Sequence, residues 1–138
     1  MTFTACTDGA SRGNPGDSGI GLVVRDEAGD LVLSEYGYIG RATNNVAEYT
    51  ALLAMLRRAR RWSCSRLVIR SDSELMVRQI SGDYKVRDEG LRPLYRKVVD
   101  LLERSPFPVE VRHIPRDENG EADRLANQGI DTRRKIRV

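Results

Sequence analysis

The sequence predicts an α/β protein with a five-stranded mixed sheet flanked by helices, in which three antiparallel strands precede two parallel ones. Three observations predict this class. Apolar and β-branched runs joined by short turns fill residues 2–39, helical periodicity begins near Asn45, and two later apolar runs are separated by helical segments. Strands separated by helices usually pair in parallel. The predicted order is therefore βββαβααβα.

The first three strands are predicted from short apolar runs between turn residues. Residues 2–8 form the first strand, and residues 9–19 form a turn because they hold four glycines and Pro15. Strands follow at 21–26 and 31–39, and the Ala-Gly-Asp loop between them has a length suited to a hairpin. Three strands joined by short turns indicate an antiparallel meander.

Helical and extended patterns alternate in the rest of the chain. Residues 45–62 carry apolar side chains at i, i+3, i+4 and i+7, and arginines near the end of this segment complement the helix dipole. The segments that follow are predicted as a strand at 67–70, helices at 73–80 and 91–104, a strand at 109–114 and a helix at 119–130.

Composition indicates one globular domain. The chain has 138 residues, 40% of them hydrophobic and 31% charged, with a net charge of +3 and a pI near 9.1. We expect a domain over 1–131 and a basic tail over 132–138. The mildly basic pI permits an anionic partner without proving one.

The sequence also sets expectations about compartment and assembly. No run approaches the ~20 apolar residues of a membrane span, and the N-terminal residues lack the pattern of a secretory signal. The two cysteines, Cys6 and Cys64, form no C-x-x-C spacing. We therefore expect a cytoplasmic protein without a membrane partner, and a monomer.

Four acids occupy the ends of predicted elements. Asp8 and Asp72 end two strands, Glu48 heads the core-facing stripe of its helix, and Asp123 borders the apolar face of the last helix. The carboxyl ends of parallel strands form one rim of a sheet, so these acids can meet there. Taken alone, each acid is better explained as a turn residue, a cap or a solvated charge, and Glu48 fits that explanation least because its position faces inward.

Converging carboxylates repel one another, and burying them is costly unless cations compensate. Hard oxygen ligands suit Mg²⁺ or Mn²⁺, and there is no Cys/His cluster to favour zinc. Two such ions would promote in-line attack at a phosphodiester. The acids therefore predict a metal-dependent phosphoryl-transfer site.

Four motifs resemble those of type 1 ribonuclease H, and they occur along the chain in the same order as in that family. TDGASRGNPG at residues 7–16 resembles TDG-x-x-x-GNPG, and TNNVAE at 43–48 resembles TNN-x-x-E. SDS at 71–73 resembles TDS, and NGEADRLA at 119–126 resembles N-x-x-A/C-D-x-L-A. The resemblance covers residues 3–131, and it is specific because several separate motifs occur together.

The resemblance implies the ribonuclease H-like fold and endonucleolytic cleavage of the RNA strand of an RNA–DNA hybrid. It implies two Mg²⁺ ions, with Mn²⁺ as a possible substitute, and 5′-phosphate and 3′-hydroxyl product ends. It assigns the metal-binding, catalytic carboxylates to Asp8, Glu48, Asp72 and Asp123.

Three asparagines in these motifs gain a role by the same resemblance. Asn14, Asn44 and Asn45 would contact the minor groove of the hybrid, where short amides can bond to 2′-hydroxyls. The alternatives are ordinary turn chemistry for Asn14 and helix capping for Asn44 or Asn45.

An auxiliary catalytic group is the least determined part of the site. His113, the only histidine, precedes Asp123 by ten positions, the spacing of a mobile histidine in some family members. The local sequence HIPRDEN is more similar to the archaeal and actinobacterial branch, in which an arginine stands in for that histidine. Arg116 matches that arginine, and the two residues are equal candidates.

Two departures from the family pattern concern the substrate. Glu74 replaces a substrate-contacting glutamine, and an acid there repels phosphate unless it points away or joins the metal ligands. The connection 81–90 is too short for the basic protrusion of some members, which leaves Lys85 and Arg87 as candidate contacts to DNA phosphates. The basic tail is either a further contact or a disordered end.

Two other functions compete with this interpretation. A proofreading-type 3′–5′ exonuclease would carry a D-x-E motif on its first strand, whereas Asp8 is followed by Gly9 and Ala10. A nucleic-acid-binding module of the same fold would have lost its metal ligands, whereas all four acids are present.

Overall fold

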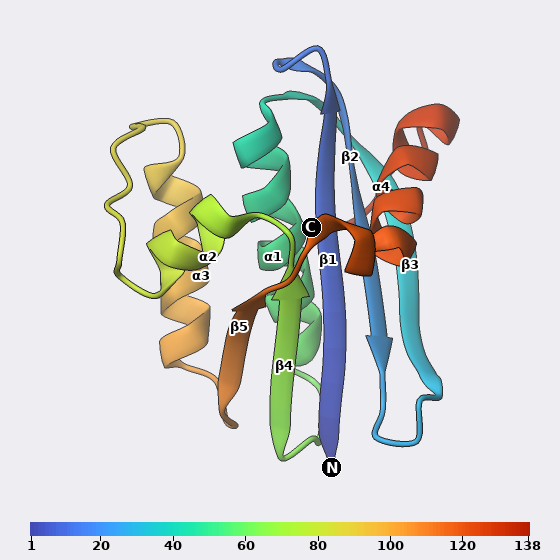
Figure 1. The fold of residues 1–138 in the computed structure, drawn as a ribbon, viewed down its shortest axis with the longest axis vertical. Coiled ribbons are helices and arrows are strands. Elements are labelled where there is room, and N and C mark those ends of the chain that lie inside the picture. The colour runs from blue at the N-terminus through green and yellow to red at the C-terminus, as the bar shows by residue number, and fades with distance from the viewer.

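The chain forms a five-stranded mixed sheet between helices, as the computed structural model of residues 1–138 shows (Figure 1). The strands are β1 (Thr2–Arg12), β2 (Gly16–Arg25), β3 (Leu31–Ala42), β4 (Arg66–Ser71) and β5 (Val109–His113). The helices are α1 (Asn44–Ala59), α2 (Glu74–Ile80), α3 (Arg92–Glu103) and α4 (Gly120–Thr132), with a short 3₁₀ turn η1 (Arg116–Glu118).

The strand order β3-β2-β1-β4-β5 confirms the predicted fold class. The pairs β1–β2 and β2–β3 are antiparallel, whereas β1–β4 and β4–β5 are parallel. β1 thus lies at the point where the sheet changes from antiparallel to parallel pairing. Sites in α/β sheets are found beyond the carboxyl ends of strands near such points.

The predicted turn at 9–19 is wrong. β1 continues to Arg12 and β2 begins at Gly16, because antiparallel pairing runs without a break to Arg12 opposite Asp17. The tight connection needs only residues 13–15, where Gly13 and Asn14 have positive φ angles. Gly19, one of the glycines that suggested a long turn, allows close packing instead. An added Cβ there would lie 2.4 Å from the carbonyl oxygen of Ala126, so α4 rests directly on β2.

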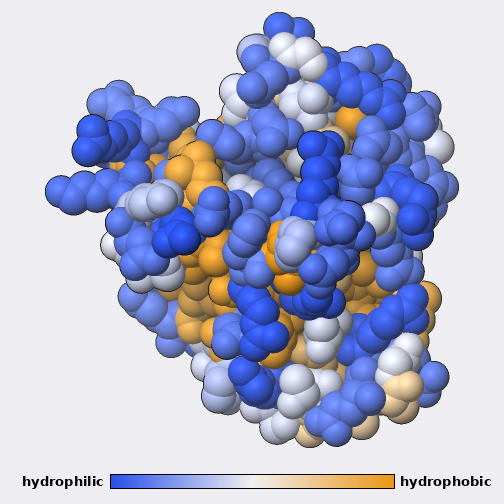
Figure 2. Space-filling model, viewed as in Figure 1, coloured by the Kyte–Doolittle hydropathy of each residue, from blue (hydrophilic) through white to orange (hydrophobic).

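Helices α1 and α4 cover opposite faces of the sheet (Figure 1). Gly9 faces α1, and Gly21, which pairs with the adjacent Asp8, faces α4. The core lies between the sheet and α1, whose largest fully buried side chains include Tyr49, Leu52 and Met55. Polar residues cover most of the face seen in Figure 2, and apolar atoms show between them in its lower half. No helix has the length and apolar character that crossing a membrane requires.

The basic tail is docked onto the sheet, so its interpretation as a disordered end is wrong. The backbone N–H of Tyr38 donates to the carbonyl of Arg134 at 2.6 Å, and Lys135 forms a parallel bridge with Tyr38. The Ile136 side chain packs over Gly37, where a Cβ would lie 2.2 Å away. Short-range sequence patterns carry no signal for this pairing between distant segments.

Candidate active site

Four carboxylates from four different elements line one cavity of about 390 Å³: Asp8 on β1, Glu48 on α1, Asp72 after β4 and Asp123 on α4. The parallel pairing of β1 with β4 explains why Asp8 and Asp72 lie close together. Its last pair is Cys6 with Arg70, so Asp8 and Asp72 each lie two residues beyond that pair, on neighbouring strands. The structure therefore brings all four predicted acids to one rim of the sheet.

Three of these acids form a tighter group. One carboxylate oxygen from each of Asp8, Glu48 and Asp72 lies within 4.8 Å of the other two, a spacing that allows all three to contact one cation. Asp123 reaches the same cavity from the other face of the sheet. Oxygen donors of this type are the ligands that Mg²⁺ and Mn²⁺ prefer.

Glu48 is held in place by the backbone of β1. The N–H of Gly9 donates to Oε1 of Glu48 at 2.8 Å, and Glu48 is only 4% exposed. The contact needs a glycine, because an added Cβ would lie 2.2 Å from the carbonyl carbon of Ala47. The absence of a side chain next to Asp8 therefore lets α1 approach β1 closely enough to deliver Glu48.

Asp72 is oriented by Asn119, a buried residue before α4. The Nδ2 of Asn119 donates to the carbonyl of Thr7 at 3.0 Å and to Oδ2 of Asp72 at 3.2 Å. Two buried atoms nearby, Asn119 Oδ1 and Thr7 Oγ1, have no hydrogen-bond partner. Buried polar atoms without partners are uncommon, and they cluster here beside the acids.

The electrostatics of the cavity favour a bound cation. Burial, followed by the charges of Glu48, Asp72 and Asp123, raises the pKa of Asp8 to about 9. Burial also raises the pKa of Glu48 to about 8, against the opposing effects of the Gly9 N–H and Arg116. Without a counterion, burial and the neighbouring carboxylates favour the protonated forms of these two acids. A divalent cation would restore their charged form, so the donor set fits a metal ion.

Sequence reasoning missed a network that holds Asp123. The Nδ2 of Asn127 donates to the Asp123 carbonyl at 3.0 Å and to its Oδ1 at 3.4 Å. Arg12 in turn donates to Oδ1 of Asn127 at 3.1 Å and to Asp131 at 2.7 Å. The i, i+4 spacing of Asp123 and Asn127 was a usable signal, whereas the contact of β1 with α4 was not visible in the sequence.

Of the three predicted asparagines, Asn44 lines the cavity and Asn14 is hydrogen-bonded to Asn44. The backbone N–H of Asn44 donates to Oδ1 of Asn14 at 2.8 Å, which joins the β1–β2 turn to the start of α1. Asn44 lines the cavity, and all three asparagines are exposed. The capping alternative for Asn44 and Asn45 is wrong, because Thr43 is the N-cap and accepts a hydrogen bond from the Val46 N–H.

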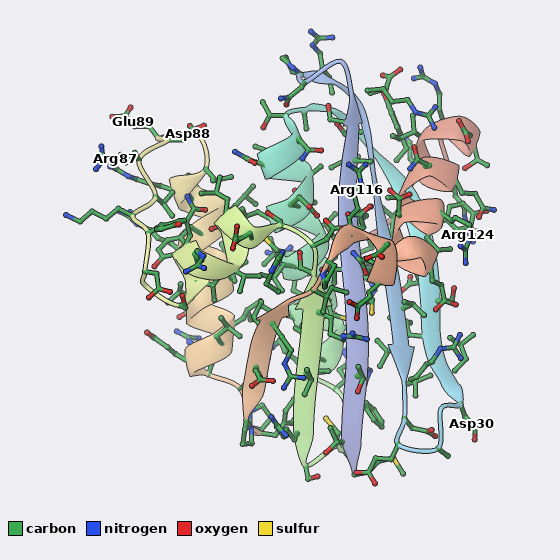
Figure 3. The ribbon with its side chains drawn as sticks, in the orientation of Figure 1. Asp30, Arg87, Asp88, Glu89, Arg116 and Arg124 are labelled. Carbon is green, nitrogen blue, oxygen red and sulfur yellow. The ribbon has the colours of Figure 1, made fainter.

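Of the remaining candidates, only Arg116 lines the cavity, although His113 pairs with the β4 residue just before Asp72. Arg116 lines the cavity, and Figure 3 shows it on the segment that crosses β1. His113 is exposed at the end of β5 and does not line the cavity. Lys85 is exposed on the connection between α2 and α3, whose neighbouring residue Arg87 lies far from Arg116 in Figure 3.

Glu74 does not line the cavity, so it is not one of the acids gathered there. It is exposed in the first turn of α2 and forms an i, i+4 ion pair with Arg78 at 3.3 Å. Its neighbour Ser73, which lines the cavity, caps the helix by accepting from the Met76 N–H.

A mixed sheet with carboxylates gathered where parallel pairing begins defines the ribonuclease H-like class of α/β proteins. Comparison with known proteins agrees, since residues 6–129 match the model of a family described as reverse transcriptase-like. The chain is 39% identical to the ribonuclease H of Halorhodospira halophila, over 92% of this chain and 91% of that protein. The chain therefore belongs to the ribonuclease H family, type 1.

Further relatives and a solved structure extend this result. A ribonuclease HI of Halobacterium salinarum is 40% identical over 90% of the chain, which spans 62% of that protein. A bifunctional protein of Mycobacterium tuberculosis is 44% identical over 90% of the chain, which spans 34% of it. The crystal structure of LC11-RNase H1 in complex with an RNA/DNA hybrid has a TM-score of 0.87 and 41% identity, with 94% of this chain and 97% of that one covered. The archaeal and actinobacterial matches agree with the predicted branch.

Proposed function

We propose that this protein is an endonuclease that hydrolyses the RNA strand of an RNA–DNA hybrid. The observation that carries the proposal is the convergence of Asp8, Glu48, Asp72 and Asp123 in one cavity of a ribonuclease H-type fold. The hybrid bound to a relative of 41% identity supports the choice of substrate.

The four carboxylates hold two divalent ions, which we propose to be Mg²⁺, with Mn²⁺ as a substitute. Asp8, Glu48 and Asp72 are grouped tightly enough to share one ion, and Asp123 supplies a further ligand from α4. Ions held there would supply activation of a water and stabilisation of the leaving 3′-oxygen, which would give 5′-phosphate and 3′-hydroxyl ends. The protein's own part is orientation: Gly9 holds Glu48, Asn119 holds Asp72, and Asn127 holds Asp123.

The exposed asparagines recognise the hybrid through its minor groove. Because Oδ1 of Asn14 accepts from the Asn44 backbone, its amide NH₂ remains free to donate to a 2′-hydroxyl. Asn44 lines the cavity with the acids, and Asn45 follows it in the first turn of α1. Lys85 lies away from the cavity, and its proposed contact is with a phosphate of the DNA strand.

Of the two auxiliary candidates, Arg116 is the better supported. It lines the cavity and its charge lowers the pKa of Glu48, whereas His113 is exposed outside the cavity. A guanidinium at this position is suited to binding the scissile phosphate and to stabilising its developing charge.

The protein is further proposed to act as a cytoplasmic monomer. Both cysteines are free in the structure, which fits a reducing compartment. The domain proposed over 1–131 includes every residue of the acidic cavity.

An end-labelled cleavage assay over four substrates tests the proposal. With Mg²⁺ we expect internal cuts in the RNA strand of a hybrid, and no cleavage of a DNA duplex. An RNA duplex included in the panel shows whether the substrate range is wider. Tight binding of the hybrid without cleavage in Mg²⁺ or Mn²⁺ would identify a binding module instead. Stepwise trimming of single-stranded DNA from its end would identify an exonuclease.

A further inference from the structure

A second cavity lies at the opposite end of α1 from the acids. It has a volume of about 830 Å³ and contains none of the four acids. Arg60 follows Glu48 by twelve positions, which is about 18 Å along a helix axis. The nine residues that line it come from β3, the end of α1 and the docked tail: Leu33, Glu35, Arg57, Arg58, Arg60, Arg61, Trp62, Arg137 and Val138.

Positive charge dominates this second cavity. Its one acidic side chain, Glu35, is already bound by Arg58, which forms a bidentate pair with it. The side chains of the other four arginines (Arg57, Arg60, Arg61 and Arg137) form no ion pair. Four uncompensated cations around one hollow create a field that attracts anions.

The helix dipole accounts for only part of this cluster. Cations in the last turn of a helix are favourable, which explains Arg57 and Arg58 on α1. Arg137 comes from the tail, which is brought here by its pairing with β3 and by the bond from Arg58 to the Arg137 carbonyl. Two distant segments therefore contribute guanidinium groups to one hollow, and guanidinium groups match phosphate oxygens in geometry.

An aromatic ring lies beside these cations. Trp62 is half-buried and lines the cavity, and its ring forms a T-shaped pair with Phe3 at a centroid distance of 5.6 Å. Leu33 and Val138 add apolar surface next to it. Unpaired arginines along a groove with an aromatic side chain are the combination that binds single-stranded nucleic acid, since phosphates contact the cations and bases stack on rings.

We propose that this arginine-lined cavity binds a single-stranded segment of nucleic acid, with phosphates on Arg57, Arg61 and Arg137 and a base against Trp62. A peptide made of acidic residues alone would satisfy the cations but leave the aromatic surface without a matching group. The site is separate from the acidic cavity, so it would hold a strand that extends beyond the cleaved duplex or a second nucleic-acid molecule.

Trp62 provides a direct probe because it is the only tryptophan in the chain. A short single-stranded oligodeoxythymidine is added to the full chain in EDTA, and tryptophan fluorescence is recorded at several salt concentrations. We expect a saturable change whose affinity falls with salt. Arg57→Ala/Arg61→Ala should weaken binding about tenfold and reduce the slope of log K against log salt by about 1.4, because each single-strand phosphate contact contributes about 0.7.

The matched control is Arg96→Ala/Lys97→Ala, which removes the same charge from exposed positions on α3. This control should keep the affinity within about twofold. Equal weakening by both pairs, or no saturable change in the wild type, would overturn the proposal. An equal affinity for polyglutamate would show that the cavity takes any polyanion and would overturn the nucleic-acid assignment. The assay needs neither metal nor cleavage, so its failure is separate from failure of the proposed catalysis.

The base-stacking part is tested by Trp62→Phe and Trp62→Leu, with anisotropy of a labelled oligonucleotide as the readout. Phenylalanine keeps a ring and the contact with Phe3, whereas leucine keeps only apolar volume. We expect leucine to weaken binding about tenfold and phenylalanine to weaken it less, since stacking requires a ring face. Identical affinities for both variants and the wild type would show that Trp62 does not contact the bound strand.

Discussion

The backbone N–H of Gly9 donates to Oε1 of Glu48 at 2.8 Å, and this bond links the residue next to Asp8 with the helix that supplies a second acid. The same glycine lets the backbone of Ala47 approach to within 2.2 Å of where a Cβ would stand. One position on β1 thus determines how closely α1 packs and where the Glu48 carboxylate lies.

Gly9→Ala should destabilise the fold and displace Glu48. The new methyl group would overlap backbone atoms of α1, which cannot rotate away, so we expect a loss of about 3 kcal/mol in the free energy of unfolding. Urea denaturation measures this loss. Gly120→Ala is the control, because a Cβ there meets only the end of Arg124, at 3.6 Å. Equal stability of Gly9→Ala and wild type would contradict the packing described here.

Stability in EDTA should fall as pH rises from about 5 to about 8. The pKa values of Asp8 and Glu48 are raised from 3.8 and 4.5 to about 9 and about 8, so the folded chain binds more protons than the unfolded chain over this window. Each extra proton that the folded chain binds must be released as the pH rises. The unfolding equilibrium constant therefore increases with pH, by up to about tenfold per pH unit for each such proton. Urea midpoints at several pH values in EDTA measure the slope.

Mg²⁺ should reverse this trend, because it binds the ionised carboxylates of the folded chain and not the unfolded chain. Asp8→Asn, which cannot ionise, should show a shallower loss of stability with pH in EDTA than the wild type. A wild-type stability that rises across pH 5–8 in EDTA would be incompatible with the raised pKa values.

Asn127→Ala should lower metal-dependent turnover by about tenfold or more. The substitution removes the amide that donates to Oδ1 of Asp123, and loss of such a supporting bond typically costs about 10–100-fold in activity or metal affinity. Turnover on a hybrid is measured as a function of Mg²⁺ concentration, with Gln128→Ala, an exposed neighbour, as the control. A matching Mg²⁺ dependence in both variants would exclude a positioning role for Asn127.

Arg116→Ala should slow hybrid cleavage more than His113→Ala does. Arg116 lines the acidic cavity, whereas His113 is exposed outside it, so we expect at least about a tenfold loss in kcat for the first and less than about twofold for the second. Single-turnover rates at saturating enzyme separate this effect from substrate binding. Negligible effects of both substitutions would show that neither residue is an auxiliary catalytic group. A larger effect of His113→Ala would assign that role to His113.

The fold class and the meeting of the acids were predictable because both depend on local order. Alternation and helical periodicity define the sheet. The prediction that Asp8 ends its strand is wrong, since β1 continues to Arg12, but Asp8 still meets Asp72 because parallel pairing between β1 and β4 stops two residues earlier. The length of β1 was underestimated, because glycines at 9–19 are also signals for turns. In the structure Gly19 and Gly21 serve close helix packing, which depends on segments about a hundred positions away.

The parts of the site that sequence reasoning missed all require tertiary contacts. Asn119 reaches Thr7 and Asp72, and Arg12 reaches Asn127, across sequence separations that no periodicity reports. The docked tail is a similar case, since its pairing with Tyr38 has no local pattern. The position of Arg116 in the cavity and of His113 outside it also depends on tertiary structure.

Calorimetric titration of Mn²⁺ into the wild type and Glu48→Gln at pH 7.5 tests most directly whether the acidic cavity is a metal centre. Glutamine keeps the size of the side chain and its ability to accept from the Gly9 N–H, but it removes the charge. We predict saturable binding to the wild type and at least about a tenfold weaker affinity in the variant. The same Mn²⁺ affinity in both proteins, or no binding to either, would contradict the account.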